Sequence, residues 1–158
     1  MLKITPFLWF DTQAEEAANL YVSIFPNAKV TSVSRYSEAG PGPAGSAMTV
    51  QIELDGLPVT LLNGGPVFKP TEAFSFSVTC EDQAEVDRYW AALTADGGEE
   101  SQCGWLKDRY GFSWQIVPRA LPELLGDPDR AKARRAMQAM LQMKKLDVAK
   151  LREAAEVA

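Results

Sequence analysis

Residues 72–85 read EAFSFSVTCEDQAE, and this stretch decides the fold because it repeats the pattern of residues 3–15, KITPFLWFDTQAE. In the later copy, polar and apolar side chains alternate up to the cysteine, which is the period of a half-buried strand. The triplet QAE at 83–85 then reproduces the triplet at 13–15, 70 positions earlier. Both stretches therefore predict a strand that runs directly into a helix.

Each copy of the QAE triplet follows a residue that can cap a helix. Thr12 precedes the first copy, and Glu15 can reach back to it, which makes a capping box. Asp82 takes the same position before the second copy. Apolar residues then recur at the helical period, at Ala17, Leu20, Tyr21 and Ile24 and again at Val86, Tyr89, Trp90 and Leu93.

Three short strand patterns follow each predicted helix. They cover residues 29–37, 48–54 and 57–63 in the first copy, and 100–104, 105–108 and 112–118 in the second. The dipeptide Asp55-Gly56 between two alternating runs predicts a hairpin. The chain therefore contains a repeated βαβββ unit.

The repeat predicts an α+β duplicated domain over residues 1–118, with modules at about 1–65 and 70–118. One module alone cannot cover both faces of its sheet, so we expect the pair to form a cup-shaped mixed sheet with a cleft on its concave face. Residues 119–158 form a C-terminal helical extension. Its main helix is predicted at 129–145, and Asp147 looks like the N-cap of a last helix.

Composition limits the classes of partner. The formal charge of −5 over 158 residues disfavours nucleic acid, because phosphate binding needs a positive field. No stretch approaches the length of a membrane span, and the N-terminus lacks a signal-peptide pattern. Two cysteines suit a reducing compartment, so we expect a cytoplasmic protein with no membrane partner.

Several motifs together carry a family resemblance. They are ITPFLWFD at 4–11, NGGP at 63–66, CGWLKDRYG at 103–111, SWQIVP at 113–118 and AMLQMKKLDV at 139–148. The chain resembles the PhnB-like branch of the vicinal-oxygen-chelate (glyoxalase/bleomycin-resistance) superfamily, a group also labelled 3-demethylubiquinone-9 3-methyltransferase. The resemblance covers essentially the whole chain. It implies two βαβββ modules, a cup-shaped sheet and a homodimer.

In metal-dependent members of that superfamily, the ligands lie on the first and last strands of each module and are typically His, Glu or Gln. The internal repeat places these positions at Thr5, Thr60, Ser75 and Gln115. The chain has no histidine, and three hydroxyls with one amide are poor donors for a transition metal. A hard cation held by Glu53 or Asp108 is disfavoured, since few carboxylates converge. We expect no metal and no cofactor.

The parity of the strands predicts which residues line a small-molecule site on the concave face. The expected ligand-binding residues are Thr5, Trp9, Gln51, Glu53, Thr60, Ser75, Ser77, Trp105 and Gln115. Hydroxyls and amides between aromatic side chains are typical of such pockets. The alternative is that each polar residue simply faces water and that the tryptophans pack in the core.

Two residues are candidates for catalysis. Glu53 is a possible general base, because partial burial beside Trp9 could raise its pKa. The alternative is a surface carboxylate near a hairpin turn. Cys103 is a possible nucleophile, but only Lys107, Arg109 or a helix N-terminus could activate its thiol. The alternative is a small buried residue.

Three functions remain open from sequence alone. The first is a homodimer that binds a small organic molecule in a metal-free cleft. The second is a metal-independent isomerase or lyase that uses Glu53 as base. The third is partner binding through the C-terminal helices. The methyltransferase label is not supported, because the first strand-to-helix turn, residues 10–13, lacks the glycines that hold a Rossmann-type cofactor.

Overall fold

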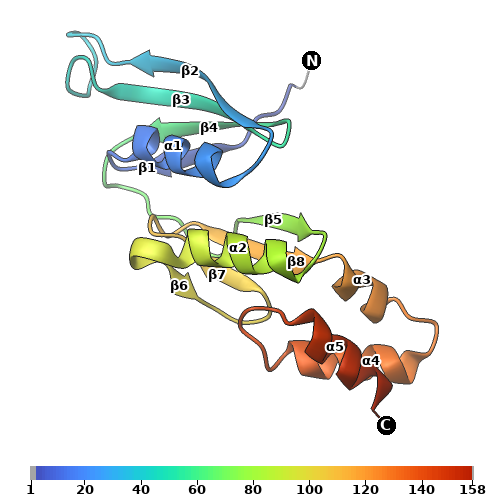
Figure 1. The fold of residues 1–158 in the computed structure, drawn as a ribbon. Coiled ribbons are helices and arrows are strands. Elements are labelled where there is room, and N and C mark those ends of the chain that lie inside the picture. The colour runs from blue at the N-terminus through green and yellow to red at the C-terminus, as the bar shows by residue number, and fades with distance from the viewer. Residues whose placement is uncertain (1–2, 158) are drawn as a thin grey trace. The chain divides into compact units, whose positions relative to one another are not determined.

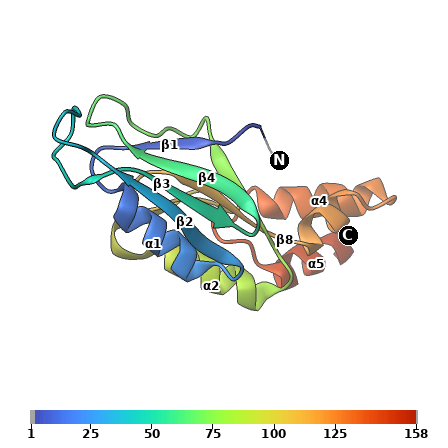
Figure 2. The ribbon, with the colours of Figure 1, turned by 90° about the horizontal axis from the view of Figure 1, so that it is seen from above.

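The computed structural model describes residues 3–157 and divides the chain into two compact units, with the boundary between Pro70 and Thr71. Each unit contains one four-stranded sheet. In the first unit α1 lies along one face of the sheet, and in the second α2 does so (Figure 1, Figure 2). The predicted α+β class is confirmed.

The first unit has the order β-α-β-β-β. Its elements are β1 (Phe7–Phe10), α1 (Ala14–Ile24), β2 (Ala28–Arg35), β3 (Ala47–Leu54) and β4 (Leu57–Asn63). The strands lie in the order β1-β4-β3-β2, with β1 parallel to β4 and the other pairs antiparallel.

The second unit repeats this topology. Its sheet module comprises β5 (Ser75–Cys80), α2 (Gln83–Thr94), the short 3-10 helix η1 (Ala95–Gly97), β6 (Glu99–Glu100), β7 (Trp105–Lys107) and β8 (Ser113–Pro118). The sheet order is β5-β8-β7-β6, with β5 parallel to β8. The strand registers also repeat, since Phe7 pairs with Thr60 and the matching Ser77 pairs with Gln115. The predicted duplication of the βαβββ module is therefore confirmed, and the strand register repeats with it.

Strand alternation decides which face of the first sheet is buried. The helix α1 packs on it through small side chains, which let the two elements approach closely. The buried set is Leu8, Phe10, Val50, Ile52, Leu54, Val59 and Leu61 from the strands and Ala14, Ala17, Ala18 and Tyr21 from α1. Residues of the opposite parity lie on the other face, where the sequence places the candidate site.

The two module helices begin differently. Asp82 caps α2 as predicted, because its side chain accepts a hydrogen bond from the Glu85 amide. The predicted capping box at Thr12 is wrong. Gln13 is the N-cap of α1, and Asn63 Oδ1 on β4 accepts from the Ala14 amide at 2.8 Å. An acceptor distant in sequence satisfies that donor.

The two predicted C-terminal helices are present: α4 (Arg130–Met140), which ends five residues earlier than predicted, and α5 (Val148–Glu156). A further helix, α3 (Ala120–Leu125), precedes them and was not predicted. Asp129 and Asp147 cap α4 and α5 through their side chains. Pro122 lies in the first turn of α3, where a missing amide proton is tolerated.

The extension packs on the sheet module of its own unit. Leu121, Leu146 and Leu151 form a buried cluster with which Val117 of β8 is in contact. Gln83 at the start of α2 donates to the Leu146 carbonyl and accepts from the Val148 amide. Among residues 3–157, no helix combines the length and the apolar character that crossing a membrane requires.

Candidate functional site

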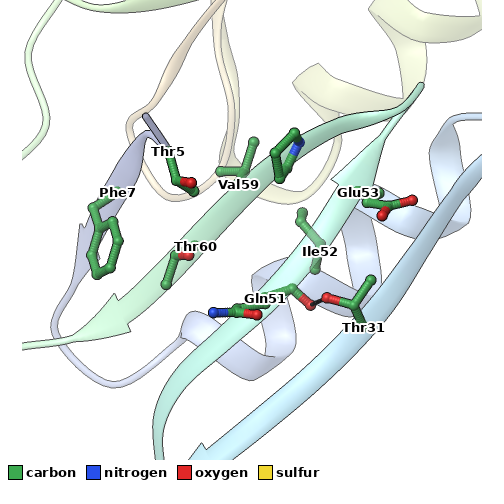
Figure 3. A pocket seen from close by; sticks show the side chains of 9 residues that line it. Thr5, Phe7, Thr31, Gln51, Ile52, Glu53, Val59 and Thr60 are labelled. Carbon is green, nitrogen blue, oxygen red and sulfur yellow. Dashed lines mark hydrogen bonds between the residues drawn. The ribbon is translucent and has the colours of Figure 1, made fainter. Parts of the chain in front are cut away.

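The open face of the first sheet carries a pocket with a volume of about 280 Å³ (Figure 3). Two strand segments and the residues before β1 supply most of its wall. The lining residues are Thr5, Phe7, Thr31, Gln51, Ile52, Glu53, Pro58, Val59 and Thr60. Four predicted ligand-binding residues, Thr5, Gln51, Glu53 and Thr60, therefore lie in one pocket.

The centre of this pocket is a row of side chains across the sheet. Phe7 pairs with Thr60, and Thr60 pairs with Gln51. Ser32 on β2 donates to Gln51 Oε1 at 3.1 Å. Thr31 donates to the Gln51 carbonyl at 3.1 Å (Figure 3). The bond from Ser32 orients the Gln51 side chain and leaves its NH2 group available to a ligand.

Glu53 lies at the end of the pocket away from Phe7 (Figure 3). Its side chain is 39% exposed and forms an ion pair with Lys29 at 3.7 Å. The predicted neighbourhood of Glu53 and Trp9 is wrong. The row that contains Trp9 includes Thr49, which is four residues away from Glu53 along β3.

Trp9 lies on β1, where it pairs with Leu62 near the end of β4, and it does not line this pocket. Its indole Nε1 donates to the Gly65 carbonyl at 2.8 Å, and its ring meets Phe68 edge to face. A Cβ at Gly64 would lie 2.3 Å from the ring, so the glycine permits this close approach. These contacts give Trp9 a packing role against the NGGP segment.

The remaining predicted ligand-binding residues lie in the second unit. Ser77 and Trp105 both pair in register with Gln115. Gln115 Nε2 donates to Ser75 Oγ at 2.9 Å. The hydroxyl of the neighbouring Ser113 is buried without a hydrogen-bond partner among the described residues. The face therefore carries the hydroxyls of Ser75, Ser77 and Ser113, the Gln115 amide and the Trp105 indole on neighbouring strands.

The four positions that correspond to metal ligands carry poor donors for a transition metal. Thr5 and Thr60 contribute only hydroxyls to the pocket of the first unit. In the second unit, the Gln115 amide is bonded to Ser75. Within residues 3–157 no group of three or more His, Cys, Asp or Glu side chains is placed to hold a metal ion. The residues present do not fit the metal site of metal-dependent relatives.

Asp108 has a structural role instead. Its Oδ1 accepts from the Tyr110 and Phe112 amides, and its Oδ2 accepts from Trp114 Nε1 at 2.9 Å. Asp108 is only 2% exposed. A carboxylate that accepts three hydrogen bonds inside the protein stabilises the turn between β7 and β8.

Cys103 lies in a tight turn with a φ of 58°. Its amide donates to the Met143 carbonyl, and the next amide, of Gly104, donates to Lys144. The two cations predicted to activate its thiol are engaged in ion pairs: Lys107 with Glu72 and Arg109 with Asp96. The turn connects the sheet module to the extension.

Five lining residues lie outside the predicted ligand-binding set: Phe7, Thr31, Ile52, Pro58 and Val59. A β-bulge between Val30 and Ser32 changes the parity of β2 at Thr31. Nothing in an alternating pattern marks the position of a bulge. Pro58 shares the parity of Thr60 and could have been found by continuing the strand pattern toward the hairpin.

Comparison with known proteins places this geometry in a family. The family model described as 3-demethylubiquinone-9 3-methyltransferase matches residues 2–117. The structure is similar to a PhnB protein of Bacillus cereus with the same methyltransferase description, at 36% identity and a TM-score of 0.69. That match covers 74% of this chain and 99% of the other. No curated protein matches the chain.

More distant solved structures share the fold. A protein of Pseudomonas aeruginosa is 20% identical with a TM-score of 0.62, over 75% of this chain and 98% of its own. The fosfomycin resistance protein FosX of Listeria monocytogenes is 18% identical with a TM-score of 0.57, over 80% of this chain and 100% of its own. The chain therefore belongs to the PhnB-like family described as 3-demethylubiquinone-9 3-methyltransferase, and it has the vicinal-oxygen-chelate fold.

Proposed function

We propose that the protein binds a small organic molecule in the pocket on the first sheet and needs no metal to do so. The observation that carries this proposal is the row Phe7, Thr60 and Gln51, which sets an aromatic ring, a hydroxyl and an oriented amide on three adjacent strands. Pockets for small molecules combine apolar walls with a few fixed polar groups in this way. The protein then acts by sequestering its ligand.

The size of the pocket supports a small ligand. Its volume of about 280 Å³ is near the lower end for ligand pockets. Strand positions hold polar groups more rigidly than loops, which reduces the entropy lost on binding.

We do not extend the methyltransferase name to an activity of this chain. A Rossmann-type methyltransferase has a parallel, doubly wound sheet with a glycine-rich first turn. Here each described sheet is mixed, and the first turn is Asp11, Thr12 and Gln13.

The proposal is tested by screening a small-molecule library by NMR, with and without EDTA, and repeating each hit on variants. Binding is expected to survive EDTA and to fall about tenfold or more in Gln51→Leu, because the amide that Ser32 holds in the pocket is lost. Gln138→Leu is the matched control, since Gln138 is exposed on α4. Hits that bind both variants equally, or that need an added metal, would contradict the proposal.

The enzymatic alternative uses Glu53 as a general base in a metal-independent isomerase or lyase. Its ion pair with Lys29 leaves the carboxylate 39% exposed and accessible from the pocket. Turnover of a bound compound that disappears in Glu53→Gln, while binding persists, would replace the sequestering role with this one.

Two further properties belong to the same proposal. We propose a homodimer, with the family resemblance as support, and light scattering of the purified chain tests it. We propose a cytoplasmic location, since Cys80 and Cys103 are both free thiols.

The third option, partner binding through α4, is tested with Met137→Gln and Leu141→Gln, because both side chains are exposed.

A further inference from the structure

We propose that the ligand of this pocket is an amphipathic organic cation, with an ammonium group on an apolar or aromatic body. This inference rests on the proposed function of the same pocket. It names the chemical class that the distribution of charge and apolar surface in the pocket selects.

The charge inside the pocket has one sign. Glu53 is the only ionisable side chain among the nine described lining residues. No lysine or arginine of the described chain lines the pocket, so a carboxylate or phosphate ligand would meet the Glu53 carboxylate without a cation among the lining residues to balance it. The sequence up to Pro70 also carries six acidic and four basic residues, which favours the approach of a cation.

The present partner of Glu53 is easily replaced. Lys29 reaches it from the neighbouring strand at 3.7 Å, with 69% of the lysine side chain exposed. Exposed ion pairs of this kind contribute little to stability. A ligand ammonium can therefore take the place of the lysine, and Lys29 acts as an internal competitor.

The opposite end of the pocket is apolar. Phe7 is 62% exposed although it lies on a strand of the sheet. It lies two strands away from Gln51, a separation of about 10 Å, while Glu53 lies two residues further along β3. Thr60 lies between these ends (Figure 3). A ligand that fills the pocket thus meets a ring at one end and a carboxylate at the other.

The test titrates the full chain with three probes: phenethylammonium, the uncharged phenethyl alcohol of similar size, and the anion hydrocinnamate. The NMR signal of the Gln51 side-chain amide reports binding of each probe. We expect the affinity for the cation to be at least about tenfold higher than for the alcohol, and the affinity for the anion to be the lowest. Added salt should weaken the binding of the cation alone.

Variants assign the effect to the pocket. Glu53→Gln should reduce cation binding to the level of the alcohol, and Lys29→Met should strengthen it severalfold because the competitor is gone. Glu38→Gln removes the same charge from an exposed loop and should leave all three affinities unchanged. Opposite responses of Glu53→Gln and Lys29→Met cannot arise from partial unfolding.

The outcomes separate this inference from the proposed function. If the alcohol binds as tightly as the cation, the cation class is wrong while the pocket remains a binding site. If none of the three probes shifts the Gln51 amide, the cation class is overturned, and the library screen decides the proposed function independently. If Lys29→Met weakens the binding of the cation, Lys29 is not a competitor, and the inference is wrong.

Discussion

Asp108 shows how one residue fixes a local structure, because both of its carboxylate oxygens are used. Oδ1 accepts from two backbone amides and Oδ2 from the Trp114 indole. An asparagine has a single oxygen, so Asp108→Asn must lose the bond to Trp114 or to the turn. We expect a loss of about 2–3 kcal/mol in the free energy of unfolding. Urea denaturation followed by tryptophan fluorescence measures it.

The control for Asp108 is Asp11→Asn, an exposed aspartate in the first unit. It should change the free energy of unfolding by less than about 0.5 kcal/mol. Equal effects of the two substitutions would mean that net charge, and not the hydrogen bonds of Asp108, is what matters.

Cys80 gives a pH prediction. Burial raises the pKa of the Cys80 thiol from 9.0 to about 12. The folded state therefore keeps its proton while the unfolded state loses it, so the contribution to stability is complete below pH 9 and is lost as the pH rises toward 12. Over this window, the unfolding free energy of wild type should fall relative to that of Cys80→Ala by about 1.4 kcal/mol per pH unit.

Denaturation curves of both chains at several alkaline pH values measure the Cys80 effect. Lysine and tyrosine titrations contribute equally to both chains and cancel in the difference. Parallel pH profiles for the two chains would show that Cys80 is not protected by burial.

At the scale of elements, Gln83 connects the start of α2 to the C-terminal extension. Its side chain donates to the Leu146 carbonyl at 3.0 Å and accepts from the Val148 amide at 2.8 Å. Gln83→Ala leaves both groups without this partner. We expect the packing of α5 on the rest of the unit to become weaker by about 1–3 kcal/mol. Hydrogen exchange should therefore accelerate in α5 and in residues 146–148 while β1 to β4 stay protected.

Gln138→Ala on α4 is the matched control for Gln83, because Gln138 is exposed. Exchange in α5 should be the same as in wild type. If Gln83→Ala also leaves α5 unchanged, the leucine cluster alone holds the extension.

Helix starts show what a sequence pattern predicts at this scale and what it misses. Asp82, Asp129 and Asp147 were predictable as caps, because each acts on amides two or three residues ahead. Thr12 has the same pattern and does not cap α1. The N-cap is Gln13, and Asn63, 49 residues from Ala14, accepts from the Ala14 amide. Local patterns predict local bonds, whereas a distant competitor becomes visible only in the folded chain.

The same distinction applies to the candidate site of the whole molecule. The parity of the strands assigned Thr5, Gln51, Glu53 and Thr60 to one face, and all four line one pocket. It could not predict the bulge that adds Thr31, or the contacts with Gly65 and Phe68 that hold Trp9 outside it. Periodicity assigns a residue to a face, but its position along that face depends on pairing and on packing between segments.

The donor set of the whole chain leads to a prediction about metals. A metal bound only by the folded state with a Kd of about 1 μM would, at about 1 mM, stabilise the protein by about 4 kcal/mol. For a chain of this length the Tm would rise by roughly 8 °C or more. Since Thr5, Thr60, Ser75 and Gln115 offer no carboxylate or imidazole, we expect Mn²⁺ or Zn²⁺ to shift the Tm by less than about 1 °C relative to EDTA.

Differential scanning calorimetry of the full chain with each metal and with EDTA makes this measurement, and metal analysis after dialysis accompanies it. A rise of several degrees together with one retained metal ion per chain would contradict it. A flat response leaves the hydroxyls, the Gln51 amide and the single carboxylate as the groups that a ligand must satisfy.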